Sequence, residues 1–176
     1  MVEGEPAGTR SGGAFMNIGF ALNGKPVEIE IEARETLAEV LRGRCRLTGV
    51  KLSCEAQVCG SCTVLVDDLT VSACTYLAYE VRGKRVTTIE GLADESGRLH
   101  PLQQAFLDNF AFQCGFCTPG MILAAKAFLD EKAGEKAEVT DAEIVAHMNG
   151  NLCRCTGYLP ILKAIRQAAT QLRGEK

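Results

Sequence analysis

The cysteines constrain this chain more than any other feature of its sequence. Nine are present among 176 residues, and eight of them fall in three short runs. The runs are Cys54, Cys59, Cys62 and Cys74, then Cys114 and Cys117, then Cys153 and Cys155. The first fifteen residues lack the basic segment and apolar core of a secretory signal, so we expect a cytoplasmic protein. Disulfides are rare in that compartment, and clustered cysteines there are usually metal ligands or catalytic groups.

The first run has the spacing C-x4-C-x2-C, and its fourth cysteine, Cys74, follows after eleven residues. This is the plant-type spacing for a [2Fe–2S] cluster. A loop around a compact cluster offers three thiolates together with backbone N–H groups, and a neighbouring segment supplies the fourth thiolate. Zinc sites with four cysteines usually use two short CxxC knuckles instead. The spacing therefore favours a [2Fe–2S] cluster over zinc or unliganded core thiols.

The other two runs are short pairs, Cys114 with Cys117 and Cys153 with Cys155, separated by 35 residues. Cys153 and Cys155 are poorly placed to bridge each other, because a disulfide requires well-separated Cα atoms and suitably directed Cβ atoms. Each pair precedes a predicted helix, so an antiparallel helix pair could bring the four thiols together. On spacing alone, zinc is a reasonable alternative for this set. A redox CxxC is disfavoured because no thioredoxin-like βαβ pattern surrounds it.

Cys45 and the two histidines have no partner at a ligand spacing. Cys45 lies near the end of a short predicted helix, and free cysteine packs as a small hydrophobic residue, so we expect a buried free thiol. His100 precedes a predicted helix start and His147 lies late in another helix. Neither has the spacing to cysteine that a Rieske-type cluster requires, so we expect surface or packing roles for both.

The N-terminal half has the two-residue periodicity of a small sheet. Strands are predicted over residues 16–22, 27–31, 63–66, 69–72 and 86–89. Asn23-Gly24 is a strong turn signal for a hairpin between the first two strands. Thr36 and Glu39 form a capping-box sequence, which opens a short helix with an apolar face. A hairpin, a helix and then further strands is the element order of a β-grasp sheet.

After a polar segment at 91–97, the periodicity becomes helical. Helices are predicted to start at Pro101, at Thr118-Pro119, after the capping box of Thr140 and Glu143, and at Pro160, with a charged connection over 132–138. Four short helices predict a four-helix bundle. The predicted fold class is therefore α+β. It comprises a flexible tail over residues 1–14, a β-grasp ferredoxin-like domain over 15–91 and a helical domain over 98–174.

Three motifs together resemble the iron–sulfur subunit of the molybdenum hydroxylases, the xanthine oxidase family. They are C-x4-CGSCTV at 54–64, FQCGFCTPGM at 112–121 and GNLCRCTGY at 150–158, and the resemblance runs from about residue 16 to about residue 172. It implies a [2Fe–2S] cluster for each cysteine set, with iron in place of the zinc alternative in the helical domain. One departure lies between the first two ligands, where the family often has glycine and this chain has Glu55-Ala56-Gln57-Val58.

The resemblance also implies partners and an electron path. A large subunit binds molybdopterin cytosine dinucleotide and hydroxylates its substrate with oxygen from water, and a further subunit commonly carries FAD. Gln113 matches a glutamine that hydrogen-bonds the molybdopterin, and Cys155 matches the ligand whose sulfur faces the pterin amino group. Electrons would pass from molybdenum to the helical-domain cluster, then to the ferredoxin-like cluster, then to FAD or another acceptor. A dimer of heterotrimers is one expected assembly.

Other functions are disfavoured by the sequence. The formal net charge is −3 and the pI is about 5.5, without the basic footprint of a nucleic-acid binder. No apolar run approaches the roughly 20 residues of a membrane helix. The sequence has no glycine-rich phosphate loop, nucleophile elbow or carboxylate pair, so this chain does not convert a substrate alone. Two rival functions are a free-standing two-cluster ferredoxin-like carrier and a zinc-binding structural scaffold. The helical half argues against the carrier, because a soluble shuttle needs only one cluster domain.

Overall fold

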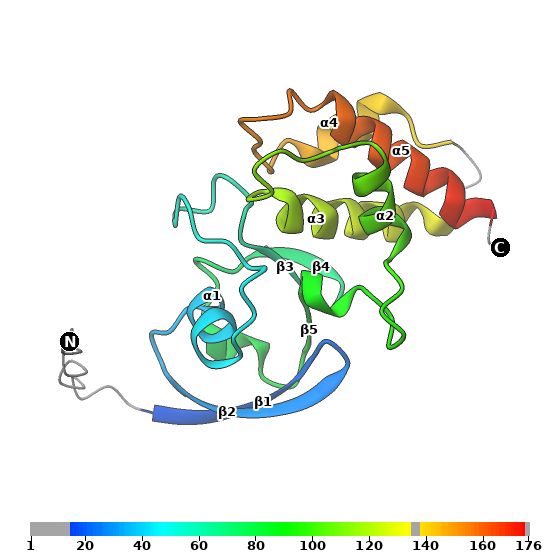
Figure 1. Cartoon of the computed structure of the whole chain (residues 1–176). Coiled ribbons are helices and arrows are strands. Elements are labelled where there is room, and N and C mark those ends of the chain that lie inside the picture. Colours follow the sequence, from blue (N-terminus) through cyan, green and yellow to red (C-terminus); the bar gives the residue numbers. More distant parts are fainter. Residues whose placement is uncertain (1–14, 135–137, 175–176) are drawn as a thin grey trace, which may run out of the picture.

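The computed structural model describes residues 15–134 and 138–174. The predicted tail over residues 1–14 lies outside the described residues, as do residues 135–137 of the predicted charged connection. In the described part, a five-stranded sheet with one short helix forms one half, and four longer helices form the other half (Figure 1). The α+β class predicted from the sequence is confirmed.

The sheet has the strand order β2-β1-β5-β3-β4. Its strands are β1 Phe15–Leu22, β2 Lys25–Glu32, β3 Thr63–Val66, β4 Leu69–Ser72 and β5 Arg85–Thr87. β1 and β5 run parallel, whereas the other neighbouring strands are antiparallel. β3 is buried along its whole length. Pro26 lies in β2, an edge strand, where its missing N–H breaks no ladder.

The predicted hairpin turn and the first capping box are both confirmed. Asn23 and Gly24 have φ angles of 50° and 78°, the positive values that a tight two-residue hairpin turn requires. The Thr36 N–H donates to Glu39 Oε2 at 2.7 Å, and the Glu39 N–H donates to Thr36 Oγ1 at 3.3 Å. The helix that begins here, α1 Leu37–Glu39, continues as a π-helical turn over Val40–Arg44 and buries its apolar side chains against the sheet.

The last strand differs from the prediction of a strand over residues 86–89. β5 ends at Thr87, and Ile89–Gly91 forms a 3-10 turn. The Thr88 N–H donates to Asn23 Oδ1 at 2.9 Å, which ties the end of β5 to the hairpin turn. Ile89 then packs against the core of the helical half. The apolar residue that extended the predicted strand therefore belongs to the second core of the protein.

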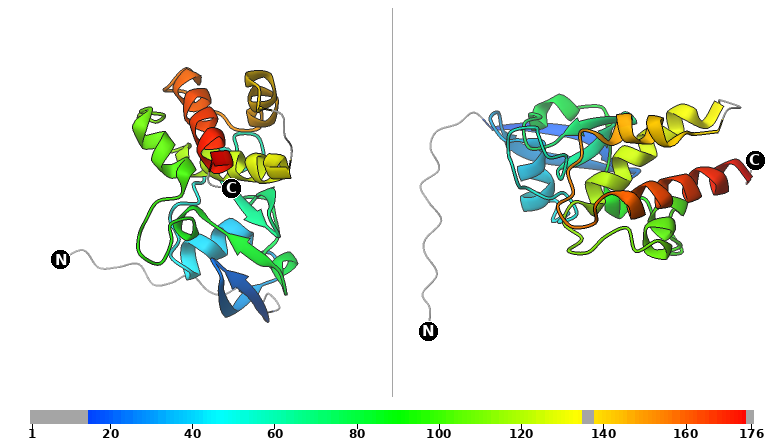
Figure 2. Two further views of the ribbon diagram at one scale, coloured as in Figure 1. Left: turned by 90° about the vertical axis from the view of Figure 1, so that its right-hand side faces the viewer. Right: turned by 90° about the horizontal axis from the view of Figure 1, so that it is seen from above.

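The helical half contains four helices with a hydrophobic core of their own. They are α2 Pro101–Asp108, α3 Thr118–Glu131, α4 Asp141–Met148 and α5 Leu159–Gly174. α5 packs against α2 and α4, while α3 contacts α2 and α4 on one side and β3 and β4 on the other. α3 thus lies between the sheet and the remaining helices (Figure 2). Within the residues described, no helix combines the length and apolar character that a membrane span requires.

Two helix starts, those of α3 and α5, differ in detail from the sequence predictions. Cys117 occupies the cap position of α3, so Thr118 is the first helical residue and not the cap. The Thr118 hydroxyl is buried and has no hydrogen-bond partner among the described residues. α5 begins at Leu159, one residue before Pro160. His100 caps α2 because its Nδ1 accepts a hydrogen bond of 3.2 Å from the Leu102 N–H, and the capping box at Thr140 is present as predicted.

Candidate metal centres

The loop before β3 holds the first three cysteines and curls around the sulfur of Cys54. Glu55 and Gln57 have positive φ angles of 49° and 59°, which direct successive backbone N–H groups inward. The N–H groups of Ala56, Val58 and Cys59 lie 3.5, 3.4 and 3.4 Å from Cys54 Sγ. These three donors hold the pKa of the Cys54 thiol near 6, from an ordinary value of 9.0. The loop therefore stabilises the thiolate form that binds metals.

Cys62 and Cys74 form the buried side of the first set. Their exposed fractions are 3% and 9%, whereas Cys54 is exposed and Cys59 is half-buried. Burial raises the pKa of Cys62 to about 11, and the neighbouring thiol groups of Cys74 and Cys59 add to this effect. The Cys54 thiol also interacts with that of Cys59. The thiols of the first predicted set are thus linked by pairwise interactions, Cys54 with Cys59 and Cys62 with both Cys74 and Cys59.

The four cysteines of the helical half lie in two interacting pairs. Cys114 Sγ lies 3.6 Å from Cys155 Sγ, and both residues are exposed. Cys117 and Cys153 are half-buried, and their thiols interact with each other. Burial, followed by the Cys153 thiol, raises the pKa of Cys117 to about 12. The pKa of Cys155 is raised as well, chiefly because its thiol hydrogen-bonds that of Cys114.

Cys153 differs from Cys117 and Cys155 because its pKa is lowered. Burial acts to raise the pKa, but the Thr156 hydroxyl, 3.2 Å from Cys153 Sγ, and nearby backbone N–H groups outweigh it. The Cys153 N–H in turn donates to the Tyr158 hydroxyl at 2.9 Å. The loop after α4 therefore orients Cys153 through two contacts, one to its backbone N–H and one to its side-chain sulfur.

The thiol contacts in the helical half run in pairs, Cys114 with Cys155 and Cys117 with Cys153. Across residues 15–134 and 138–174, no three His, Cys, Asp or Glu side chains converge as closely as one bound ion would need. In a [2Fe–2S] cluster each iron takes two protein ligands. Two pairs of sulfur donors fit such a group by number and by chemistry.

The structure also shows the surroundings of three other residues that the sequence analysis singled out, Gln113, Cys45 and His147. Gln113 is exposed and precedes Cys114 directly. Cys45 is half-buried against the core of the sheet, and burial alone raises its pKa. His147 has the packing role expected for it, with its ring centroid 4.9 Å from that of Phe128 and its Nε2 3.2 Å from the Ala124 carbonyl oxygen.

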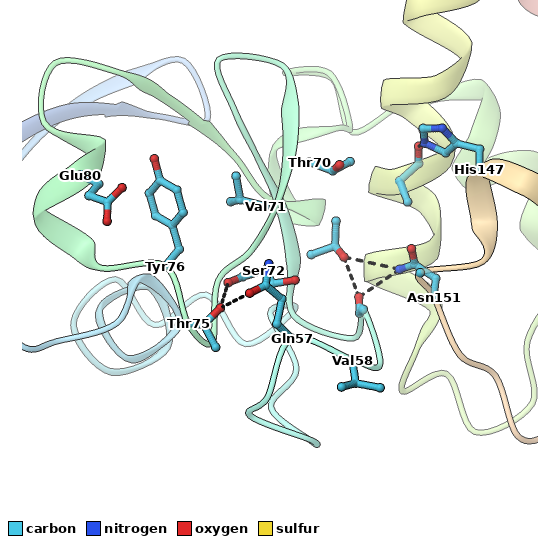
Figure 3. A pocket seen from close by; sticks show the side chains of 14 residues that line it. Gln57, Val58, Thr70, Val71, Ser72, Thr75, Tyr76, Glu80, His147 and Asn151 are labelled. Atoms are coloured by element: carbon cyan, nitrogen blue, oxygen red, sulfur yellow. Dashed lines mark hydrogen bonds between the residues drawn. The ribbon is translucent and has the colours of Figure 1, made fainter.

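Sequence reasoning assigned no role to Asn151, which lies two residues before Cys153. Its side chain is only 7% exposed, and its amide Nδ2 donates to the Gly60 carbonyl oxygen at 3.0 Å. Asn151 also lines a hollow of about 570 Å³ between the sheet and the helical half, together with Gln57, Tyr76 and His147 (Figure 3). Its position inside the third cysteine motif was the only signal in the sequence.

Comparisons with known proteins agree with this geometry. The family model for the 2Fe-2S iron-sulfur cluster binding domain matches residues 20–93, and the model for the [2Fe-2S] binding domain matches residues 88–166. The nicotine 6-hydroxylase small subunit of Paenarthrobacter nicotinovorans is 42% identical over 89% of this chain and 92% of its own length. The nicotinate dehydrogenase small FeS subunit of Eubacterium barkeri is 44% identical over 87% of this chain and 94% of its own length.

Solved structures show the same relationship. A chain of quinoline 2-oxidoreductase from Pseudomonas putida 86 matches with a TM-score of 0.84 and 41% identity, over 91% of this chain and 97% of that one. The aldehyde oxidoreductase from Desulfovibrio desulfuricans also matches with a TM-score of 0.84, at 39% identity, although this chain spans only 17% of its length. The chain therefore belongs to the iron–sulfur subunits of the molybdenum hydroxylase, or xanthine oxidase, family, which transfer electrons through two [2Fe–2S] clusters.

Proposed function

We propose that the two cysteine sets are the ligands of the two [2Fe–2S] clusters. Cys54, Cys59, Cys62 and Cys74 bind the ferredoxin-like cluster, and Cys114, Cys117, Cys153 and Cys155 bind the helical-domain cluster. The observation that carries this assignment is the interaction of the thiols within each set, in pairs in the helical half. Thiolates are the usual protein ligands of such clusters, which accept and release single electrons when bound. Cys45 is not a ligand because it lies against the apolar core.

We propose domain boundaries at 15–91 and 98–174, with a β-grasp fold in the first domain and a four-helix bundle in the second. Two separate hydrophobic cores support this division. Ile89 and Leu92 pack against the second core, so the connection between the domains is anchored on the helical side.

The surface around Cys114 and Cys155 is the proposed docking face for a large subunit that binds molybdopterin cytosine dinucleotide. Both thiols and Gln113 are exposed there. Large exposed apolar side chains lie in the same cysteine motifs or within two residues of them in sequence, at Phe110, Phe116, Leu152, Tyr158 and Leu159. Exposed apolar groups gathered in this way mark interaction surfaces. Gln113 and Cys155 would face the pterin, and the names of the relatives as small subunits support a larger partner.

A second partner subunit carrying FAD is proposed to dock beside the ferredoxin-like cluster. Cys54 is exposed, and the Val58 side chain next to Cys59 is 61% exposed. Both therefore present this cluster loop to a partner. The complete complex would be a dimer of heterotrimers in the cytoplasm, in which this chain carries electrons and the large subunit converts the substrate.

Metal and sulfide analysis of the purified chain tests the ligand assignment. We expect about four irons and about four acid-labile sulfides per chain, because two complete cysteine sets hold two clusters. No stoichiometric zinc is expected. A preparation with half this iron and one zinc per chain would falsify the two-cluster assignment and revive zinc for the helical half.

A further inference from the structure

The two cysteine-bearing loops touch each other directly at Asn151. The Asn151 amide donates to the Gly60 carbonyl oxygen at 3.0 Å and to Thr63 Oγ1 at 3.4 Å. One residue later, the Leu152 N–H donates to the Cys59 carbonyl oxygen at 2.9 Å. Asn151 is one of only four polar or charged residues classed as buried in the described part of the chain. The amide nitrogen of this buried side chain therefore makes both of its hydrogen bonds to the other half of the protein.

The Gly60 carbonyl oxygen is enclosed from several sides. Besides the Asn151 amide, it accepts from the Thr63 N–H at 3.1 Å and from the Thr63 hydroxyl at 2.7 Å. A Cβ atom on Gly60, whose φ is +69°, would lie 2.5 Å from Asn151 Nδ2. A Cβ atom on Gly120 of α3 would overlap the Gly60 carbonyl oxygen. The first cluster loop is thus held between the start of α3 and the loop that follows α4.

These contacts lie next to the candidate ligands on both sides. Gly60 follows Cys59 directly, and Asn151 precedes Cys153 by two residues. The covalent connection between the halves is no substitute, because residues 94–97 within it are exposed. The packing of α3 on β3 and β4 joins the two halves, and the contacts at Asn151 and Leu152 then hold the loops of Cys59 and Cys153 against each other.

We infer that Asn151 is a positioning residue that sets the separation of the two metal centres and thereby the rate of electron transfer between them. This inference rests on the proposed assignment of the eight cysteines. Tunnelling between redox centres falls steeply with distance, so a small shift between the loops changes the rate. The hollow beside Asn151 offers space for water when the amide is removed, so the loops would loosen instead of closing on each other (Figure 3).

The test compares Asn151→Ala and Asn151→Asp with Asn109→Ala in the full chain carrying its clusters. Asn151→Asp keeps the side-chain volume and removes the donor that faces Gly60. Asn109 is a matched control, since its amide also donates two hydrogen bonds, to the Ala105 carbonyl at 2.8 Å and to Gln167 Oε1 at 2.7 Å, but both lie within the helical half. Full reduction with dithionite makes both clusters paramagnetic, and the magnetic splitting of their EPR signals at low temperature reports their separation.

We expect the splitting to be reduced or lost in both Asn151 variants, with iron content unchanged, and retained in Asn109→Ala. Amide hydrogen exchange at Leu152 should become about tenfold faster in the Asn151 variants, as expected when one buried hydrogen bond is lost. Wild-type splitting in both Asn151 variants would overturn the positioning role, as would loss of iron in both. A wild-type chain without two cluster signals would instead overturn the ligand assignment.

Discussion

The backbone N–H of Leu152 donates a 2.9 Å hydrogen bond to the carbonyl oxygen of Cys59. Leu152 directly precedes Cys153 in the chain. This one hydrogen bond therefore connects the backbone of a cysteine in the first set with the backbone of a cysteine in the second set. The two halves of the protein have separate hydrophobic cores, yet their cysteine loops meet at this point. The contact brings together the two loops that carry the proposed ligands, an arrangement that suits a relay of electrons between two clusters.

This arrangement predicts the order of electron transfer in the assembled complex. Gln113 and Cys155 lie on the proposed docking face of the molybdenum-containing subunit, so the helical-domain cluster should be the first acceptor. Cys117→Ser should then leave the ferredoxin-like cluster and the flavin oxidised after substrate is added. Cys59→Ser should leave the helical-domain cluster reducible while flavin reduction collapses. Rapid-freeze EPR distinguishes the two signals.

The two variants act as controls for each other, because each removes one ligand from a different set. The order is wrong if the Cys117→Ser complex, with its other centres intact, reduces its ferredoxin-like cluster at the wild-type rate.

The left-handed backbone of the first cluster loop predicts an effect of glycine at position 57. Gln57 has a φ of 59°, a conformation that costs a residue with a Cβ about 1–2 kcal/mol. Gln57→Gly and Gln57→Ala both remove the hydrogen bond from Thr75 Oγ1 to Gln57 Oε1, but only glycine relieves the backbone strain. We expect the glycine variant to unfold about 2–8 °C above the alanine variant, since about 1 kcal/mol corresponds to about 2–4 °C in a chain of this size. Thermal unfolding, followed by loss of the visible absorption of the clusters, measures the difference, and equal midpoints would contradict it.

Cys45 should be dispensable for cluster binding. It is half-buried among apolar side chains, and burial is the cause of its raised pKa. Cys45→Ala should leave the EPR spectra of both clusters intact and lower the free energy of unfolding by only about 1 kcal/mol, since one small side chain is truncated. Cys74→Ala provides the contrast, because it removes a proposed ligand. If Cys45→Ala abolished a cluster signal, the assignment of Cys74 as the fourth ligand would be untenable.

The capping box of α4 predicts an acid-dependent step in stability. The Thr140 N–H and hydroxyl, followed by Lys132, lower the pKa of Glu143 from 4.5 to about 2. A carboxylate whose pKa is lowered by folding stabilises the folded state above its ordinary pKa, and this contribution is lost as the pH falls from about 4.5 to about 2. Glu143→Gln keeps an oxygen acceptor for the Thr140 N–H but cannot titrate.

Circular dichroism melts of wild type and Glu143→Gln at a series of pH values measure this effect. The stability advantage of wild type should be constant near neutral pH and should shrink below pH 4.5. A difference between the two proteins that does not change with pH would show that the Glu143 charge does not contribute.

Much of this protein was determined by its sequence, because the relevant interactions are local. The turn at Asn23-Gly24 and the capping boxes at Thr36 and Thr140 depend on residues at most three positions apart, and all are present as predicted. The cysteine spacings likewise predicted two sets, since a loop around a cluster must place its ligands within a short stretch of chain. The α+β class followed from the change of periodicity near residue 91.

Only the tertiary structure decided how the two halves meet. Three observations depend on segments that are distant in sequence. β5 ends at Thr87, where the next residue is hydrogen-bonded to Asn23. Cys114 lies beside Cys155, and the Asn151 amide is buried against Gly60. Local periodicity carries no information about such contacts, because they depend on α3 packing against β3 and β4. The docking of α3 on the sheet brings the two cysteine loops together and gives Asn151 its place between them.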